Sequence, residues 1–388
     1  MKILHVISSL DPARGGPITC VMSLAAAQAY MGCTVQLASY RDATWPTDGQ
    51  SRSIPYFDQV SLSGVSADGV IERLFAWQAS KMLHDLIKTN DVIHLHGVWD
   101  PILLQAGRIA RQAGKPYVIT SHGALNTWSL AQKRLKKQLI LALFVRRQLN
   151  NCAFIHALNT MEAECISALR LNCPTRILPN GIFPEEFANL PPQGTLENRY
   201  PQLHGRRYIL FLGRLHLVKG LDYLAEAFAQ VASEAKDLDL VVVGPDEGAQ
   251  KEFEQRISSH SLQGRVHLLG PLYGSDKYAA LRDAVCLVQP SRQEGFSMAI
   301  TEALAYGIPV VISESCYFPE VAENNAGEVV RLNADELAQA ILRIATDPER
   351  RTRMSIAGQE LVLTHYTWHS VAADFVREYR GVITHTGV

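Results

Sequence analysis

The sequence predicts an α/β protein built from two domains, each with a doubly wound parallel sheet. Short apolar runs rich in β-branched residues alternate with longer helical patterns over nearly the whole chain. One stretch without periodicity interrupts this alternation, and 388 residues, only 19% of them charged, suffice for two cores. Sheets of this kind bind ligands beyond the carboxyl ends of their strands. We therefore expect the two domains to face each other across a cleft.

The order of the elements defines the domain boundaries. The stretch 188–205 is rich in Pro, Asn, Gln and Gly, which favours a linker. We therefore predict a first domain over 1–187, a linker over 188–205 and a second domain over 206–365. The strand-like runs before the linker are 2–8, 34–39, 91–96, 117–121, 154–159 and 175–180, and those after it are 208–213, 238–244, 265–270, 284–291, 309–313 and 327–332.

Composition argues against several classes of protein. A formal net charge of -1 gives no electrostatic reason to expect a nucleic-acid partner. The seven cysteines form no C-x-x-C pair and no zinc spacing, so they indicate reduced thiols. The first residues, MKILHVISSLD, are too short an apolar run for a signal peptide, and no run of about 18 apolar residues follows. We expect a cytoplasmic protein that does not span a membrane.

Site residues are expected directly after strands, and Arg214 and Lys219 meet this condition in GRLHLVKG. A guanidinium and an ammonium on one turn suit a diphosphate, although two solvated surface charges remain an alternative. The segment matches neither the P-loop nor the dinucleotide-binding pattern. Asp237 and Asp239 instead lie at the beginning of the strand 238–244, where we expect a solvated turn.

The segment SRQEGFSMAITEALAYG carries two carboxylates, Glu294 and Glu302, around a predicted helix start near Ser297. Eight helical residues rise about 12 Å, so the two acids are expected to address different parts of a long ligand. The alternative is a dipole-favoured charge at Glu294 and an exposed Glu302. Free backbone N–H groups at this helix start would attract phosphate; they belong to Phe296, Ser297, Met298 and Ala299.

In the first domain, Gly15 and Gly16 follow the first strand, where they permit either close approach to a ligand or a tight turn. His122 follows the strand 117–121 as a candidate site residue, with a purely structural histidine as the alternative. His94 and His96 alternate along the strand 91–96, so we expect them on opposite faces and unable to share a metal. Only His96 would lie near the binding edge.

The helix predicted over 132–150 has basic ends around an apolar centre. A solvated basic face is one interpretation, and docking on an anionic membrane surface is the other. The basic residues are Lys133, Arg134, Lys136, Lys137, Arg146 and Arg147.

Taken in order, these motifs resemble a known family. Gly15-Gly16, SHG with His122, PNGI at 179–182, GRLHLVKG, and Glu294 with Glu302 are similar to the retaining GT-B glycosyltransferases of family 4, the group 1 glycosyltransferases. The resemblance implies two Rossmann-like domains, with the acceptor on the first and the donor on the second. It also implies that the last helix, within 366–388, crosses back to the first domain.

The resemblance implies a role for each candidate. Glu294 would contact sugar hydroxyls, Glu302 the ribose, and Arg214 with Lys219 the diphosphate of a nucleotide sugar. His122 would contact the donor sugar and support the reacting centre, so that it would act as a catalytic residue with Arg214, Lys219 and Glu294. Gly15, Gly16, Gly244 and the backbone at 296–299 would complete the donor site. The family implies neither a metal nor another cofactor.

Ser297 departs from the family pattern, because relatives often carry glycine there. Its hydroxyl is expected to cap the helix or touch the sugar. We expect UDP-glucose as donor and GDP-mannose as the second choice. The expected function is hexose transfer to a glycan or lipid-linked acceptor in exopolysaccharide or related polysaccharide synthesis, at the inner face of a membrane. A nucleotide-sugar epimerase and a catalytically silent sugar-nucleotide binding protein are the alternatives.

Overall fold

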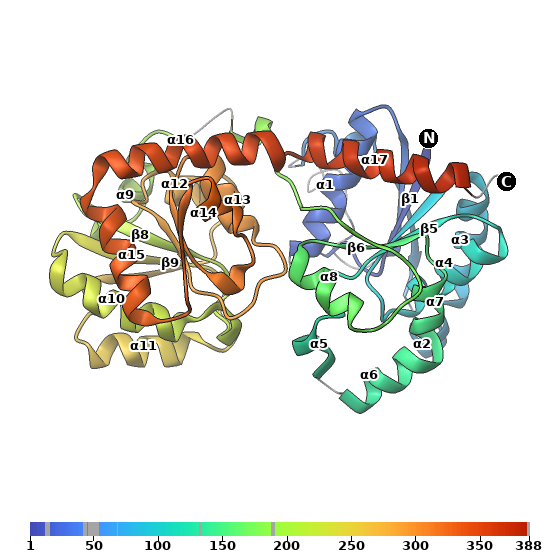
Figure 1. The fold of residues 1–388 in the computed structure, drawn as a ribbon, viewed down its shortest axis with the longest axis horizontal. Coiled ribbons are helices and arrows are strands. Elements are labelled where there is room, and N and C mark those ends of the chain that lie inside the picture. Colours follow the sequence, from blue (N-terminus) through green and yellow to red (C-terminus); the bar gives the residue numbers. More distant parts are fainter. Residues whose placement is uncertain are drawn as a thin grey trace. The chain divides into compact units, whose positions relative to one another are not determined.

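A computed structural model describes residues 1–11, 16–41, 45, 54–67, 69–131, 134–187 and 191–385. The chain forms two compact units, Met1–Phe183 with Thr367–Val388, and Pro184–Tyr366. Each unit is a wholly parallel sheet covered by helices (Figure 1). The predicted fold class is confirmed, and the last helix, α17 (Trp368–His385), packs against α1 (Gly16–Tyr30) of the first unit.

The first unit contains a seven-stranded sheet in the order β3-β2-β1-β4-β5-β6-β7. Because the strand order reverses between β1 and β4, the switch point that binds ligands in such sheets lies at their carboxyl ends. All six predicted runs form strands, and one further strand, β3, was not predicted. The strands are β1 (Lys2–Ile7), β2 (Thr34–Arg41), β3 (Ser61–Ser66), β4 (Val92–His96), β5 (Tyr117–Thr120), β6 (Phe154–Ala157) and β7 (Thr175–Ile177).

The two faces of this sheet differ in polarity. Leu4, Val6, Ile93 and Leu95 belong to an apolar core that includes residues of α3 and α4. The opposite face, which carries His5, contacts residues of α1 and α17. The further helices of this unit are α2 (Val70–Phe75), α3 (Trp77–Thr89), α4 (Pro101–Gln112), α5 (Thr127–Ala131), α6 (Arg134–Ile140), the π-helical η4 (Leu141–Val145), α7 (Arg146–Asn150), α8 (Thr160–Ser167) and the 3-10 turn η3 (Phe57–Gln59).

The second unit contains a six-stranded sheet in the order β10-β9-β8-β11-β12-β13, and its switch point lies between β8 and β11. All six predicted runs form strands. They are β8 (Arg207–Leu212), β9 (Leu238–Val243), β10 (Val266–Gly270), β11 (Leu287–Gln289), β12 (Val310–Ser313) and β13 (Gly327–Val330).

Helices cover both faces of the second sheet, and the apolar core includes Phe211, Phe228, Val288 and Ile341. The described part of the predicted linker, 191–205, belongs to this unit and contains α9 (Thr195–Arg199) and the turn η6 (Pro201–Leu203). No helix among the described residues is long and apolar enough to cross a bilayer. The main helices are α10 (Leu221–Glu234), α11 (Gln250–Ser259), α12 (Gly274–Arg282), α13 (Met298–Ala305), α14 (Glu320–Glu323), α15 (Ala334–Thr346) and α16 (Pro348–His365), with short turns η5 (Pro184–Phe187), η7 (Leu217–Lys219) and η8 (Glu314–Cys316).

The expectation of a solvated turn at Asp237 and Asp239 is wrong for Asp239. The carboxylate of Asp237 is 60% exposed, whereas Asp239 is only 1% exposed. Asp239 accepts hydrogen bonds from Arg206 at 2.6 Å, Arg265 at 2.6 Å and His267 at 2.9 Å. Asp239 is the second residue of β9, so the strand buries it. The two arginines balance its charge, and the three hydrogen bonds satisfy its oxygens.

Candidate functional site

The carboxyl edge of the second sheet brings two predicted residues into direct contact. Lys219 follows β8 and Glu294 follows β11, the two strands of the switch point. Nζ of Lys219 lies 2.6 Å from Oε1 of Glu294, and the side chains are only 15% and 9% exposed. Gly220 makes this approach possible, because its φ is +70° and a Cβ would lie 1.8 Å from the carbonyl oxygen of Pro290.

The two oxygens of Glu294 differ in their surroundings. Oε1 accepts hydrogen bonds from Lys219 and from Oγ of Ser291, both at 2.6 Å, while Nε2 of Gln289 lies 3.5 Å away. None of the described residues donates a hydrogen bond to Oε2. The structure therefore fixes the carboxylate through one oxygen and leaves the other as an acceptor.

A second group of predicted residues lines a pocket of about 210 Å³ beside the ends of β8 and β9. This pocket includes Arg214, Gly244, Ala299 and Glu302. The Arg214 guanidinium lies 2.6 Å from the carboxylate of Glu247, and both side chains are partly exposed. Arg214 and Lys219 therefore each lie beside a carboxylate of their own, Glu247 for Arg214 and Glu294 for Lys219.

The carboxylate of Glu302 resembles that of Glu294, because a lysine donates to only one of its two oxygens. Its Oε1 accepts a hydrogen bond from Nζ of Lys277 at 2.9 Å, and no described residue donates to its Oε2. Lys277 was not predicted as a site residue. The pocket wall also requires Gly244, whose φ is +151° and whose Cβ would lie 1.9 Å from the carbonyl oxygen of Gly213.

Helix α13 begins as predicted, with Ser297 as the N-cap residue and Met298 as the first helical residue. The expectation that the Ser297 hydroxyl caps the helix is wrong, because its side chain accepts no capping hydrogen bond. Its carbonyl oxygen instead accepts from the backbone N–H and Oγ1 of Thr301. The N–H groups of the first turn remain an anion-attracting terminus. Phe296 packs near Phe318, with ring centroids 5.9 Å apart.

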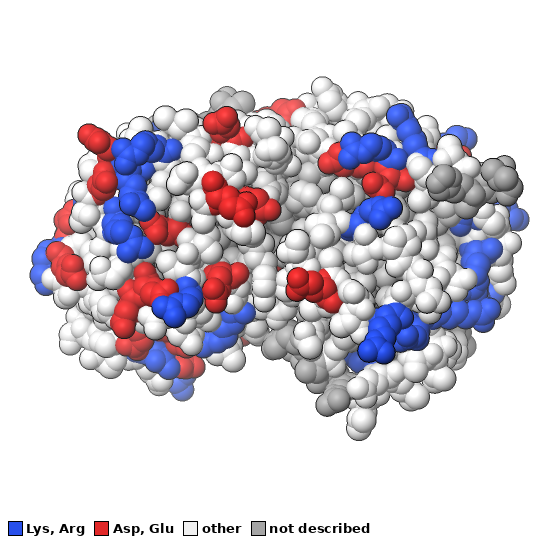
Figure 2. All heavy atoms as spheres, in the orientation of Figure 1, with Lys and Arg blue, Asp and Glu red and all other residues white. Residues whose placement is uncertain are grey.

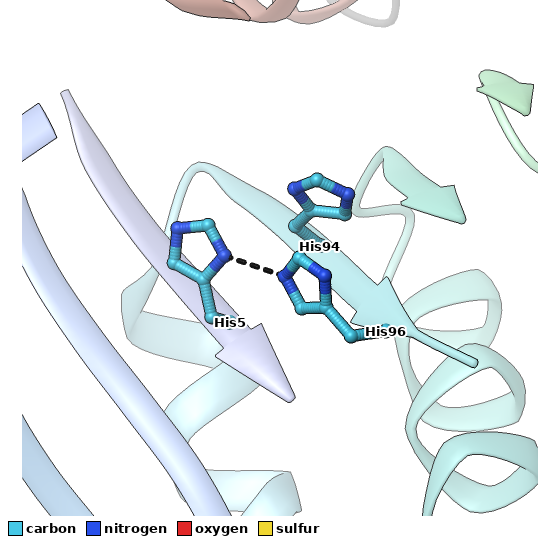
Figure 3. Close-up of side chains that lie close together, drawn as sticks. All are labelled: His5, His94 and His96. Carbon is cyan, nitrogen blue, oxygen red and sulfur yellow. Dashed lines mark hydrogen bonds between the residues drawn. The ribbon is translucent and has the colours of Figure 1, made fainter. Parts of the chain in front are cut away.

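In the first unit, a chain of hydrogen bonds leads from His122 into the interior. Nε2 of His122 lies 3.3 Å from Nδ1 of His96. Nε2 of His96 in turn lies 2.9 Å from Nδ1 of His5, the contact drawn in Figure 3. Nε2 of His5 lies 2.7 Å from Oε1 of Gln28. An amide oxygen only accepts, so His5 donates from Nε2. Each histidine then accepts at Nδ1 and donates from Nε2. This assignment leaves Nδ1 of His122 as an acceptor without a described partner.

A second chain crosses the same face of the sheet. Nε2 of His156 lies 2.7 Å from the carbonyl oxygen of Leu178, which only accepts, so His156 must accept at Nδ1. Thr120 therefore donates to Nδ1 of His156 at 2.7 Å and accepts from Nε2 of His94 at 2.6 Å. The Tyr379 hydroxyl completes the chain by donating to Nδ1 of His94 at 2.6 Å. The carbonyl oxygen of Leu178 thus determines which atom is the donor in each hydrogen bond of this series.

Burial keeps these histidines neutral. It lowers the pKa of His5 to about 4, against a smaller opposing effect of the hydrogen bond to Gln28. Burial, with the nearby His156, lowers the pKa of His122 to about 3. Burial also holds the pKa values of His94, His96 and His156 below the usual range. Neutral imidazoles are required for the donor and acceptor pattern above, since an imidazolium has no acceptor nitrogen.

A buried carboxylate fixes the turn that carries His122. His122 has φ +49°, a left-handed conformation that strains a residue with a Cβ. Glu162 accepts hydrogen bonds from Oγ of Ser121, from the backbone N–H of Gly123 at 2.7 Å and from the backbone N–H of Leu158 at 2.8 Å. Glu162 therefore clamps the residues on both sides of His122.

The expectation that His94 and His96 point to opposite faces is wrong. Residues two apart on a strand share a face, and the ring centroids of His94 and His96 lie only 4.0 Å apart. With His5 they bring three nitrogens within 4.8 Å of one another. All six ring nitrogens already have hydrogen-bond partners. A metal would have to break those bonds, so the geometry fits a polar network better than a metal site.

The remaining predicted residues are placed as follows. Gly16 is the first residue of α1, whereas Gly15 lies outside the described residues. The network residues that were not predicted are His5, Gln28, Thr120, His156, Glu162 and Tyr379. A polar residue inside an apolar strand, such as His5 in KILHVI, was the available signal in the sequence.

Two parallel α/β units with polar residues at each switch point define the class, an enzyme of the GT-B fold. Residues 15–181 match the family model described as glycosyl transferase 4-like domain, and residues 194–361 match glycosyl transferases group 1. The chain therefore belongs to the group 1 glycosyltransferases, and it is a hexosyltransferase.

Relatives match this chain over different shares of its length. A GDP-mannose:cellobiosyl-diphosphopolyprenol alpha-mannosyltransferase of Xanthomonas campestris is 23% identical over 99% of this chain and 97% of its own length. A phosphatidyl-myo-inositol mannosyltransferase of Mycobacterium leprae is 30% identical over 53% of this chain and 54% of its own. Among solved structures, Anabaena HepE in complex with UDP and glucose superimposes with a TM-score of 0.77 at 19% identity, covering 98% of this chain and 100% of that one.

Proposed function

We propose that this glycosyltransferase is a metal-independent, retaining enzyme that transfers a hexose from a nucleotide sugar to a glycan or lipid-linked saccharide. The observation that carries the proposal is the state of Glu294. One oxygen is fixed by Lys219 and Ser291, while Oε2 receives no hydrogen bond from the described residues. A mostly buried acceptor beside a cation suits a sugar hydroxyl next to a phosphate.

The other residues extend the donor site. Oε2 of Glu302 is available to ribose hydroxyls, just as Oε2 of Glu294 is available to the sugar. Nδ1 of His122 would accept a hydrogen bond from a hydroxyl of the donor sugar. Gly15 and Gly16 would let the backbone approach the phosphate. We assign the acceptor to a first domain of 1–187 with 366–388, the donor to 206–365, and the linker to 188–205.

Catalysis would rest on stabilising the departing diphosphate. Lys219, Arg214 and the first turn of α13 supply positive potential where negative charge develops as the bond between the anomeric carbon and the phosphate oxygen breaks. A new bond to the acceptor oxygen forms on the same face of the sugar. The acceptor's proton passes to an oxygen of the leaving phosphate, so this step requires no protein carboxylate as nucleophile.

For the donor, we now place GDP-mannose ahead of UDP-glucose. The two Xanthomonas relatives that cover 99% of this chain are named as GDP-mannose enzymes. UDP-glucose, the first expectation from the sequence, is retained as the second candidate, and a solved structural neighbour contains it. The epimerase alternative gains no support, because none of the relatives named here is an epimerase.

The name of the Xanthomonas campestris relative includes a diphosphopolyprenol-linked saccharide as the acceptor of that enzyme. By this likeness we propose a lipid-linked acceptor in exopolysaccharide synthesis, and a cytoplasmic enzyme attached peripherally to the inner face of the membrane.

The test is donor hydrolysis measured with GDP-mannose, UDP-glucose, UDP-N-acetylglucosamine and ADP-glucose, with and without EDTA. We expect GDP-mannose to be consumed fastest and EDTA to have no effect. Preference for a UDP sugar would overturn the donor assignment, and loss of activity in EDTA would contradict the metal-independent mechanism.

A further inference from the structure

A stripe of large apolar side chains lies exposed on the first unit, away from its histidine network. Single exposed apolar residues are ordinary, but clusters mark binding surfaces. Leu135, Leu139 and Leu143 repeat at intervals of four and so share one helical face. Of the fifteen large apolar side chains that the described residues expose, seven belong to 74–77 and 135–144, each 58–83% exposed: Leu74, Phe75, Trp77, Leu135, Leu139, Leu143 and Phe144.

These segments meet at a groove of about 500 Å³, which we call the arginine groove. Helix α4 contacts both α2 and α7, and this packing brings Leu74 and Phe75 opposite Leu143 and Phe144. The volume lies within the usual range of sites for small molecules, about 300–1,000 Å³. The π-helical η4 carries Leu143 and Phe144, and such irregular turns often occur at functional sites.

Three arginines line the same groove, Arg108 and Arg111 from α4 and Arg147 from α7. Arg108 donates to the neutral Oε1 of Gln105 at 2.9 Å. The described residues place no carboxylate within ion-pair distance of any of the three. On the face drawn in Figure 2, Lys and Arg side chains gather over α4 and α7, while the Asp and Glu side chains of this unit lie elsewhere. The groove is therefore both apolar and cationic.

We propose that the arginine groove binds one anionic phospholipid. Its phosphate would lie on the three arginines, and an acyl chain would lie along the apolar side chains of the groove, Leu74, Phe75, Leu143 and Phe144. Arginine suits phosphate because its planar fork donates two parallel hydrogen bonds. Two further exposed cations lie close by in the sequence, Lys136 on α6 and Arg146 on α7, and they add positive charge that favours an anionic surface. This site is separate from the donor site, so its test does not depend on glycosyl transfer.

A second copy of the chain fits this surface less well. In a two-fold symmetric dimer the same patch meets itself, which would place the unpaired arginines of one copy against those of the other. Such like charges repel across an interface. An anionic amphiphile satisfies both the arginines and the apolar wall.

The experiment is flotation of the full chain with phosphatidylcholine vesicles, with and without phosphatidylglycerol. We expect binding only to the anionic vesicles. The double variant Arg108→Gln/Arg147→Gln should reduce partitioning roughly tenfold or more, because each cation near such a surface contributes about 1 kcal/mol. Leu143→Ser/Phe144→Ser should reduce it similarly. Matched controls are Arg353→Gln, at a side chain 69% exposed, and Ile356→Ser, at a residue 61% exposed, both on α16 of the other unit.

Several outcomes would overturn the proposal. Equal binding to neutral and anionic vesicles, or equal loss in the groove variants and the controls, would remove the lipid site. Thermal stabilisation by inorganic phosphate equal to that by dihexanoyl phosphatidylglycerol would show an anion site without a lipid role. A concentration-dependent dimer in sedimentation that Leu143→Ser abolishes would assign the surface to a second copy. Unchanged donor hydrolysis by the groove variants, measured in parallel, would verify that they fold.

Discussion

Lys219 and Glu294 form an ion pair of 2.6 Å between segments 75 residues apart, at the point where the strand order of the second sheet reverses. In the proposed mechanism, this pair holds the Lys219 ammonium beside the departing diphosphate. We expect Lys219→Met to lower kcat/KM for donor hydrolysis by about 10²- to 10³-fold, as for the loss of one donor to developing negative charge. The double variant with Glu294→Gln should lose less than the product of the two single effects, because the residues act together. If steady-state kinetics instead show that the loss in the double variant equals the product of the two single losses, the two residues act independently.

Glu302 is expected to govern nucleotide affinity rather than turnover. Its Oε1 is held by Lys277, and Oε2 is available for ribose hydroxyls. We expect Glu302→Ala to weaken GDP binding about tenfold or more, since a hydrogen bond to a charged group contributes about 1.5–3 kcal/mol. Isothermal titration measures this change, with the exposed Glu360→Ala as the matched control. Equal affinity in the two variants would remove Glu302 from the site.

The buried histidines make the fold sensitive to acid. Their folded pKa values are lowered, to about 4 for His5, so between about pH 6.5 and 4 the unfolded chain binds protons that the folded chain does not. The contribution of these histidines to the free energy of unfolding should therefore be fully present above about pH 6.5. It should be lost progressively as the pH falls below that value. The slope is up to about 1.4 kcal/mol per pH unit for each such histidine.

Urea unfolding at several pH values between neutral and mildly acidic would measure this slope. Asp222 and Asp239, whose pKa values are lowered from 3.8, act mainly at lower pH. Burial raises the pKa of Asp283 above 3.8, so this one carboxyl opposes the histidine slope toward the acid end of the window. A free energy of unfolding that stays constant through the window would mean that the histidines are not buried and neutral as described.

Glu162 is a positioning residue for His122. In Glu162→Gln, an NH2 group replaces one acceptor oxygen and faces a group that also donates. We therefore expect the free energy of unfolding to fall by about 1–3 kcal/mol and kcat to be lower. The affinity for GDP should not change, because Glu302 and its pocket lie in the other unit. Glu164→Gln, on the same helix and exposed, is the control. An unchanged kcat together with the expected loss of stability would limit Glu162 to a structural role.

Much of the fold was predictable because parallel strands buried on both faces appear as continuous apolar runs. Strand β3 was missed because its sequence, SLSGVS, has one β-branched residue and a glycine, and it pairs only with β2 at the edge. The sequence could also predict that Arg214, Lys219 and Glu294 follow strands at one sheet edge, because the carboxyl ends of parallel strands meet there. His5, Lys277 and Tyr379 were not predictable, because their roles depend on which face of a strand or helix meets a distant segment.

The most direct test of the donor site is the rate of donor hydrolysis by Glu294→Gln, which keeps the size of the side chain and removes its charge. We predict a rate at least about 10²-fold below that of the unaltered enzyme, as expected when a group that acts at the reacting centre is lost, with little change in the affinity for GDP. Donor consumption at the unaltered rate by a folded Glu294→Gln protein would contradict the assignment of the site.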